Sequence, residues 1–184
     1  MTESKGLETR ITLRQGQKAS FEQGTLRITG KNGEASREIS HPMIQVGVEG
    51  NEIVMRVPRD TKNQKRMLNT HDAHVRNLVR GADEGHVYKL KICASHFPMT
   101  VQVAGSQLVI KNFLGEKFPR TLALKEGATV KVDGQIITVE SANKETAGTV
   151  ASDIEKLTRR PGFDPRVFQD GIYMILKDGK GVAE

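Results

Sequence analysis

Several features that define common protein classes are missing from this sequence of 184 residues. Cys93 is its only cysteine, so an internal disulfide is impossible, which favours a cytoplasmic protein. The longest apolar runs are only a few residues, far short of the ~18 that indicate a membrane-spanning helix. The opening MTESKGLETR has no apolar signal region. We therefore expect a cytoplasmic chain with no membrane partner.

Enzyme motifs are missing as well. The sequence contains no G-x-S-x-G turn, no phosphate-binding loop and no dinucleotide-binding G-x-G-x-x-G after a strand. The neighbouring carboxylates Asp83 and Glu84 fall in an expected linker, where solvation explains them. Nothing combines an acid, a base and a pocket. We expect no catalytic activity, no cofactor and no small-molecule substrate.

Two pairs of metal-binding residue types occur, but neither predicts a metal site. His71 and His74 are three residues apart on an expected helix, with Asp72 between them and no third ligand at matching spacing. A partly buried, hydrogen-bonded histidine explains His71 better. Cys93 and His96 are also three apart, but at the end of a strand such residues point to opposite faces. Cys93 is expected to be a small core residue.

Positive charge is present in excess. The net charge is +6 and the isoelectric point is about 9.5, a value typical of nucleic-acid-binding domains. Residues 1–82 hold 14 basic and 9 acidic residues, whereas residues 83–184 hold 14 and 13. The excess therefore lies in the first half.

The pattern of apolar residues predicts two similar series of strands, each followed by a helix. Alternation predicts strands at 25–29, 36–40, 43–48 and 52–57, then at 86–94, 99–104, 107–111, 121–125, 128–133 and 135–140. The first helix is expected over 61–80, with Gly81 as its stop. The second is expected from about Asn143 until Arg160 and Pro161 close it.

The two series can be aligned with each other. Leu26 and Ile28 fall on Leu108 and Ile110 at an offset of 82, and the hairpin Gly50 falls on Gly134 at an offset of 84. The shared order favours a duplication over chance similarity. We predict an α+β fold of two tandem domains, 1–82 and 83–184, each an antiparallel sheet with one helix on one face.

A basic cluster lies around the start of the first helix. Its members are Arg56, Arg59, Lys62, Lys65 and Arg66. Cations at a helix N-terminus oppose the macrodipole, so a bound anion such as phosphate would explain them. A solvated basic face explains them equally well.

The stretch after the second helix, RRPGFDPRVFQDGIYMILKDGK (159–180), combines basic and aromatic residues. Pro161, Gly162 and Pro165 favour a turning path, and 171–176 is expected to be a strand. Arginines on such an anchored loop suit bidentate contacts with phosphate. The aromatic residues either stack on bases or anchor the loop, and for Phe168 and Tyr173 anchoring is favoured. By composition, 179–181 is expected to be flexible.

Three segments, NFLGEKFPR (112–120), YKLKICASHFPM (88–99) and GFDPRVFQDGIYMILKDGK (162–180), resemble the large-subunit ribosomal protein six family in its archaeal and eukaryotic form. The resemblance implies a structural constituent of the large ribosomal subunit, and thus a role in translation. It implies binding to large-subunit rRNA near the sarcin–ricin region, mainly through the second domain. It also implies neighbouring ribosomal proteins at the base of the acidic stalk, near the subunit interface.

The resemblance also implies the residues that face RNA. They are Arg159, Arg160, Phe163, Arg166, Lys177, Lys180, Lys111 and Lys117, and the cluster of the first domain is a secondary contact. Asp164 and Asp170 replace part of the lysine- and glycine-rich tail of the bacterial form, so its lysine contacts do not transfer. Two alternatives remain open, a non-ribosomal adaptor with a basic face and an enzyme with an unrecognised site.

Overall fold

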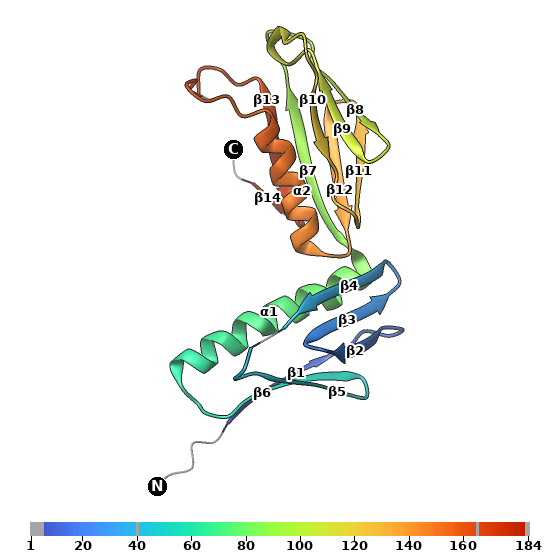
Figure 1. Cartoon of the computed structure of the whole chain (residues 1–184), viewed down its shortest axis with the longest axis vertical. Helices are drawn as coiled ribbons and strands as arrows, with labels where there is room; N and C mark the ends of the chain where they lie inside the picture. The colour runs from blue at the N-terminus through green and yellow to red at the C-terminus, as the bar shows by residue number, and fades with distance from the viewer. Residues whose placement is uncertain (1–5, 40, 165, 183–184) are drawn as a thin grey trace. The chain divides into compact units, whose positions relative to one another are not determined.

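A computed structural model describes residues 6–39, 41–164 and 166–182. The chain divides into two compact units, Met1–Gly85 and His86–Glu184, hereafter unit 1 and unit 2. Each combines one long helix with antiparallel strands (Figure 1), which confirms the predicted α+β class. No helix of the described ranges has the length and apolar character needed to cross a membrane.

In the part of unit 1 that the structure describes, the chain forms six strands and a helix. They are β1 (Leu7–Thr12), β2 (Lys18–Glu22), β3 (Thr25–Gly30), β4 (Gly33–Glu38), β5 (Gln45–Glu49), β6 (Glu52–Val57) and α1 (Lys62–Glu84). The strands form two antiparallel sheets, ordered β1-β6-β5 and β2-β3-β4. Helix α1 packs on strands of both sheets, and it buries Leu68, Val75, Leu78 and Val79 there, as its periodicity predicts.

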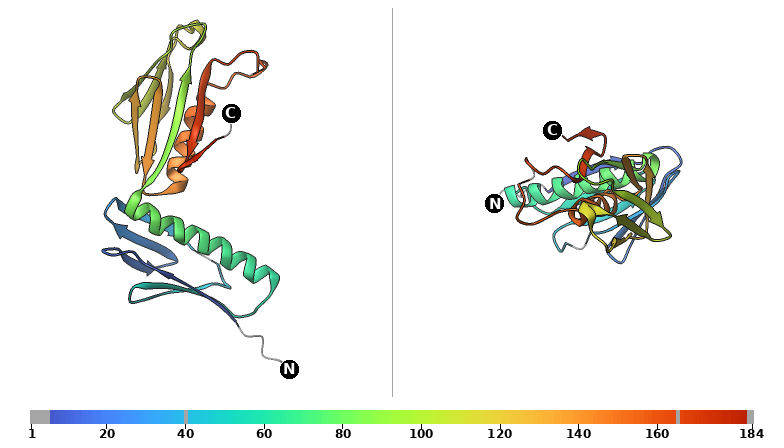
Figure 2. Two further views of the ribbon diagram at one scale, coloured as in Figure 1. Left: turned by 180° about the vertical axis from the view of Figure 1, so that it is seen from behind. Right: turned by 90° about the horizontal axis from the view of Figure 1, so that it is seen from above.

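Unit 2 repeats this design and extends it. Its elements are β7 (His86–Cys93), β8 (Thr100–Ala104), β9 (Gln107–Lys111), the 3₁₀ turn η1 (Phe113–Gly115), β10 (Arg120–Ala123), β11 (Ala128–Asp133), β12 (Ile136–Ser141), α2 (Lys144–Leu157), β13 (Gly171–Lys177) and β14 (Lys180–Gly181). The sheets are ordered β11-β12-β7-β13-β14 and β10-β9-β8. Helix α2 lies along β7, β12 and β13 (Figure 2).

The order of strands supports the predicted duplication. The order β1-β6-β5 of unit 1 recurs as β7-β12-β11 in unit 2, and β2-β3-β4 recurs as β8-β9-β10. Leu26 and Ile28, and their counterparts Leu108 and Ile110, are all fully buried. Both units therefore build their cores from the same positions of the same framework.

The predicted end of the first helix is wrong. Gly81 is buried inside α1, which continues to Glu84 and is capped by Gly85, whose N–H donates to the carbonyl of Gly81. The last turn packs tightly on β3, because a Cβ on Gly30 would lie 2.3 Å from the carbonyl oxygen of Ala82. This packing holds the helix beyond the glycine, so the expected linker at 81–85 is mostly helical.

Other boundaries also differ from the sequence patterns. Strands β1 and β2 were not predicted, and Ser40, the end of the predicted 36–40 strand, lies outside the described residues. Helix α2 stops at Leu157 rather than at Arg160. Residues 179–181 are not simply flexible, because Asp178 and Gly179, both with positive φ, form the tight turn between β13 and β14.

Candidate nucleic-acid interface

Three loops gather at one end of unit 2, and we call this surface the loop end. It comprises residues 94–99, 112–119 and 158–170, of which Pro165 lies outside the described residues. The third loop reaches this end because β13, into which it leads, runs antiparallel to β7 (Figure 1). The first two loops are joined by the side-chain amide of Asn112, which donates to the carbonyl of Pro98 at 2.9 Å.

Asp170 fixes the third loop to the first. Its side chain is only 3% exposed, and its carboxylate accepts hydrogen bonds from the backbone N–H of Ser95 at 2.8 Å and the hydroxyl of Ser95 at 2.6 Å. It also accepts from the backbone N–H and ring Nδ1 of His96, at 3.2 and 3.0 Å. Burial by itself raises the pKa of Asp170, but these hydrogen bonds outweigh it and lower the pKa to about 2.

The C-terminus of α2 is fixed by two side chains. Thr158 donates its hydroxyl hydrogen to the carbonyl of Glu155 at 3.1 Å and accepts from the backbone N–H of Ile172 at 3.0 Å. Arg120 donates to the carbonyl of Leu157 at 2.6 Å, which places a cation at the negative end of the helix dipole. The third loop therefore starts and ends at anchored points.

The second loop has an unusual backbone. Asn112 and Leu114, like Gly115, have positive φ, a costly conformation for a branched residue such as leucine. Arg120 supports this turn, since its guanidinium lies 4.4 Å from the ring centroid of Phe113 and pairs with Glu116. Hydrogen bonds from Arg120 lower the pKa of Glu116. The turn leaves Lys111 and Lys117 exposed on either side.

The aromatic residues of the third loop form a connected stack. The rings of His96 and Phe168 are nearly parallel, with centroids 4.6 Å apart. Phe163 meets Phe168 edge to face at 5.6 Å, and the guanidinium of Arg160 lies 4.0 Å from the centroid of Phe163. Phe168 thus anchors the loop, as predicted, whereas Phe163 remains 47% exposed.

The acidic residues of the loop end are all engaged by neighbours. Asp164 pairs with Arg166 at 3.0 Å, and hydrogen bonds from Arg166 lower the pKa of Asp164. Arg159, Arg160 and Lys117 are exposed and form no ion pair with any residue that the structure describes. The charge of Arg160 does contribute to the lowered pKa of Glu116. The surface therefore presents basic side chains without ion pairs beside exposed aromatic rings.

Lys177 and Lys180 do not belong to the loop end. They pair across β13 and β14 at the far end of β13, about 20 Å along the strand from Gly171 at ~3.3 Å per residue. The structure therefore places five of the eight predicted RNA-facing residues at the loop end. Lys111 lies at the end of β9, directly before the second loop, and the other two lysines lie elsewhere in unit 2.

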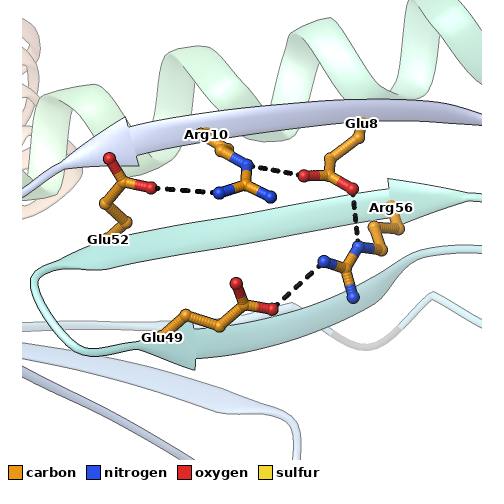
Figure 3. Close-up of polar contacts among 5 residues, drawn as sticks. All are labelled: Glu8, Arg10, Glu49, Glu52 and Arg56. Carbon is orange, nitrogen blue, oxygen red and sulfur yellow. Dashed lines mark hydrogen bonds and ion pairs between the residues drawn. The ribbon is translucent and has the colours of Figure 1, made fainter.

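The basic cluster of unit 1 is divided. Lys62, Lys65 and Arg66 line a shallow groove on the exposed face of α1, and Arg59 is exposed just before it. Arg56 lies instead on the outward face of the β1-β6-β5 sheet, where it pairs with Glu8 at 2.8 Å and Glu49 at 3.1 Å (Figure 3). Its charge is already balanced by these carboxylates.

His71 is partly buried, as predicted, but its buried Nδ1 forms no hydrogen bond with a described residue. No group of three histidine, cysteine or acidic side chains in the described part of the chain is placed to hold a metal ion. Burial lowers the pKa of His71, with a further contribution from His74, and His74 Nε2 lies 3.2 Å from the guanidinium of Arg37. Cys93 is half-buried on β7.

Sequence patterns missed several residues that shape the loop end. The partners of Asp170 lie more than seventy residues earlier, and nothing local distinguishes a buried carboxylate from a solvated one. Arg120 and Thr158 were missed because their partners Leu157 and Ile172, 37 and 14 residues away, lie in other elements that only the fold brings near. Phe97 and Phe118 could have been predicted as loop residues of this surface, because each precedes a proline within a short loop. They are 48% and 84% exposed.

The fold and this surface define a two-unit α+β protein with a candidate nucleic-acid interface. A model of the family described as ribosomal protein L6 matches residues 97–171, which include most of the loop end. A large ribosomal subunit protein uL6 of Methanococcus vannielii is 44% identical over 144 residues, 78% of this chain and 79% of the relative.

Two further archaeal proteins of the same name match almost the whole chain. That of Nanoarchaeum equitans is 39% identical over 182 residues, 95% of both chains. That of Methanobrevibacter smithii is 36% identical over 178 residues, 97% of this chain and 100% of the relative. The chain belongs to the ribosomal protein L6 family.

Proposed function

We propose that this chain is a structural constituent of the large ribosomal subunit and that it binds large-subunit rRNA through the loop end of unit 2. Family membership and the names of the relatives support the first part. The observation that carries the second is the set of exposed basic residues without ion pairs beside exposed aromatic rings. In this proposal the protein acts in translation by binding rather than by catalysis, and it works in the cytoplasm.

The chemistry of the loop end suits RNA. Exposed arginines bind phosphate bidentately, and exposed aromatic rings stack on unpaired bases. The anchors at Thr158 and Asp170 hold the third loop in place before RNA binds, which reduces the entropy lost on binding. Following the family resemblance, we place this contact near the sarcin–ricin region, with neighbouring proteins at the base of the stalk.

Unit 1 contributes a secondary contact in this proposal. The groove on α1 with Lys62, Lys65 and Arg66 offers positive charge to phosphate, with Arg59 beside it. Arg56 is the weakest of the predicted positions, because RNA would have to compete with Glu8 and Glu49. Lys177 and Lys180 form a separate, minor contact.

The test uses two matched double variants of the full chain. Arg159→Ala/Arg160→Ala removes two charges at the loop end, whereas Lys177→Ala/Lys180→Ala removes two charges at the other end of β13. Binding to large subunits depleted of this protein is measured by co-sedimentation over a range of salt concentrations. The arginine variant is expected to bind more weakly, with a salt slope smaller by about 2, since each lost phosphate contact reduces it by ≈ 1.

The lysine variant is the comparison, and it is expected to lose much less binding than the arginine variant because its contact is minor. Equal losses in the two variants would contradict the assignment of the loop end. Failure of the wild-type chain to sediment with large subunits at moderate salt would contradict the ribosomal function itself. Complexes that survive complete nuclease digestion would instead favour a protein adaptor.

A further inference from the structure

A cleft of about 540 Å³ opens beside the third loop, entirely within unit 2. It lies where the η1 turn, the last turn of α2, the third loop and the start of β13 meet. The residues that matter for the inference are Leu114, Glu155, Arg159, Arg160, Phe163 and Tyr173. The anchored ends of the third loop hold this side of the cleft in place.

The walls of the cleft are aromatic and apolar. Phe163 is 47% exposed and Tyr173 36% exposed, and both line it together with Leu114. Tyr173 is held in place, since its ring packs against the backbone of Gly171, where an added Cβ would lie 3.2 Å from the tyrosine oxygen. Fixed, partly exposed rings offer flat surfaces on which a nucleobase can stack.

The rim of the cleft is positively charged. Arg159 and Arg160 both line it, and neither forms an ion pair with a described residue. Arg160 covers one face of the Phe163 ring at 4.0 Å, so its guanidinium is already oriented. A strand of RNA that places a base in the cleft brings its phosphates to this rim.

One carboxylate supplies a polar contact inside the cleft. Glu155 Oε1 accepts a hydrogen bond from the backbone N–H of Met174 at 3.3 Å, which orients the side chain. Its other oxygen has no hydrogen bond with the residues that the structure describes. Glu155 and Tyr173 both line the cleft. Burial raises the pKa of Tyr173, and the negative charges of Cys93, Asp170 and Glu155 raise it further. A carboxylate accepts from the amino groups of bases.

We propose that this cleft binds one unpaired nucleotide of the RNA. Its base stacks on the aromatic walls and donates an amino group to Glu155, while Arg159 and Arg160 hold the flanking phosphates. Guanine fits best, because its Watson–Crick edge presents an N–H and an amino group side by side, whereas uracil has no amino group. The inference rests on the proposed function and adds the class of nucleotide that the site selects.

The test is a titration of the full-length, ¹⁵N-labelled chain with GMP, UMP and ribose 5-phosphate, followed by NMR. GMP is expected to shift the amide signals of Glu155, Phe163 and Tyr173 and to bind several-fold more tightly than UMP. Ribose 5-phosphate is expected to shift mainly Arg159 and Arg160. Equal shifts with GMP and ribose 5-phosphate would overturn the inference, as would no saturable binding of GMP.

Two variants sharpen the result. Phe163→Leu is expected to weaken GMP binding about tenfold, because it removes a stacking surface. Glu155→Gln is expected to remove the preference for GMP over UMP, because the carboxylate is lost. Asp153→Asn is the control, since it makes the same change of charge on α2 at a residue that does not line the cleft. An equal loss of preference in this control would contradict the role of Glu155.

Co-sedimentation with large subunits separates this inference from the proposed function. If the chain sediments with subunits but binds GMP no better than ribose 5-phosphate, the proposed function stands and the inference about the cleft is overturned. Thermal unfolding of each variant shows whether the domain is intact. A Phe163→Leu chain with wild-type unfolding and wild-type GMP binding would overturn the stacking role.

Discussion

The two units share a framework but differ in the segment that comes after the helix. After α1 the chain passes through Gly85 directly into β7, whereas after α2 it forms the third loop and then adds β13 and β14 to the edge of β7. In unit 1 the corresponding strand, β1, pairs only with β6 in the described part of the chain. The repeated framework therefore forms the core of each unit, whereas the third loop of the candidate interface belongs to the segment that only unit 2 has after its helix.

Net charge does not indicate which unit holds the candidate interface. Units 1 and 2 carry the same net charge, because residues 1–85 and 86–184 each hold 14 basic and 11 acidic residues. In unit 1 part of the positive charge is balanced on the outward face of β1, β5 and β6, where Glu8, Arg10, Glu49, Glu52 and Arg56 form a chain of ion pairs (Figure 3). At the loop end, by contrast, Arg159 and Arg160 form no ion pair with any described residue, although the charge of Arg160 helps to lower the pKa of Glu116. Local pairing is therefore a better guide to a phosphate contact than net charge.

The largest expected effect tests whether the two cores are equivalent. Leu26→Ala and Leu108→Ala remove fully buried side chains at matching positions, and each is expected to lower the free energy of unfolding of its own unit by about 2–5 kcal/mol. Amide hydrogen exchange, read separately for the two units, measures this. A Leu108→Ala chain with unchanged protection in unit 2 would contradict the shared framework.

The next effect concerns the anchor that unit 2 alone possesses. Because its pKa is lowered to about 2 in the folded state, Asp170 contributes about 2 kcal/mol of stability above pH ~4, and this contribution is lost as the pH falls towards 2. Asp170→Asn is expected to remove it at neutral pH. Urea unfolding of both chains between pH 2 and 7 measures the difference.

The two unfolding curves should converge at low pH. A difference in stability that stays constant from pH 7 to pH 2 would show that the charge of Asp170 does not stabilise unit 2. RNA binding should weaken together with stability, because the third loop loses its anchor to Ser95 and His96.

A smaller loss of stability is expected when the N-cap residue of either helix is replaced. Asn143 accepts from the backbone N–H of Glu145 at 2.9 Å, and Thr61 accepts from that of Gln64 at 3.3 Å. Asn143→Ala is expected to cost about 1 kcal/mol. Thr61→Ala should cost less, because its bond is longer and the Gln64 side chain still accepts from the backbone N–H of Arg59. Thermal unfolding measures both, and the reverse order would contradict the comparison.

The smallest effect concerns the exposed ion pairs. Hydrogen bonds from Arg56 and Arg10 lower the pKa of Glu8. The contribution of Glu8 to folding stability is therefore present above the pKa that Glu8 has in the unfolded chain, and it is lost in acid. Glu8→Gln is expected to lower the Tm slightly in dilute buffer and not at about 1 M salt, where screening removes the attraction. Calorimetry at both salt concentrations measures this.

Unit 2 provides the matched control for that change. Glu140, which aligns with Arg56 at the offset of the two hairpin glycines, pairs only with Lys131 among the described residues, at 3.3 Å. Glu140→Gln is therefore expected to have a smaller effect than Glu8→Gln. Equal shifts in Tm would show that the longer chain of ion pairs adds nothing.

Local patterns predicted the framework because its determinants are local. Alternation located β6, β9 and β11 at their observed bounds, and the glycines Gly50 and Gly134 marked hairpins whose turns need positive φ. Strands β1 and β2 were missed because their charged and polar residues, such as Glu8 and Arg10, hide the alternation. The last turn of α1 was missed because tertiary packing on Gly30 overrides the helix-ending tendency of glycine.

The site was predictable only in part. Sequence and family resemblance indicated the arginines, Phe163, Lys177 and Lys180 together as RNA-facing, without showing which of them share a surface. The direction of β13 separates the two lysines from the others. The buried role of Asp170 depends on residues from a distant loop, and no one-dimensional pattern contains that contact.

The position of β13 also determines when each unit can fold during synthesis. Unit 1 is complete when Gly85 has been made, whereas β7 waits for β13, which begins at Gly171 and carries the fully buried Ile172. At ~5–20 residues per second this interval lasts on the order of ten seconds. The first unit can therefore fold alone, and the loop end of unit 2 forms last, after the rest of its unit has been synthesised.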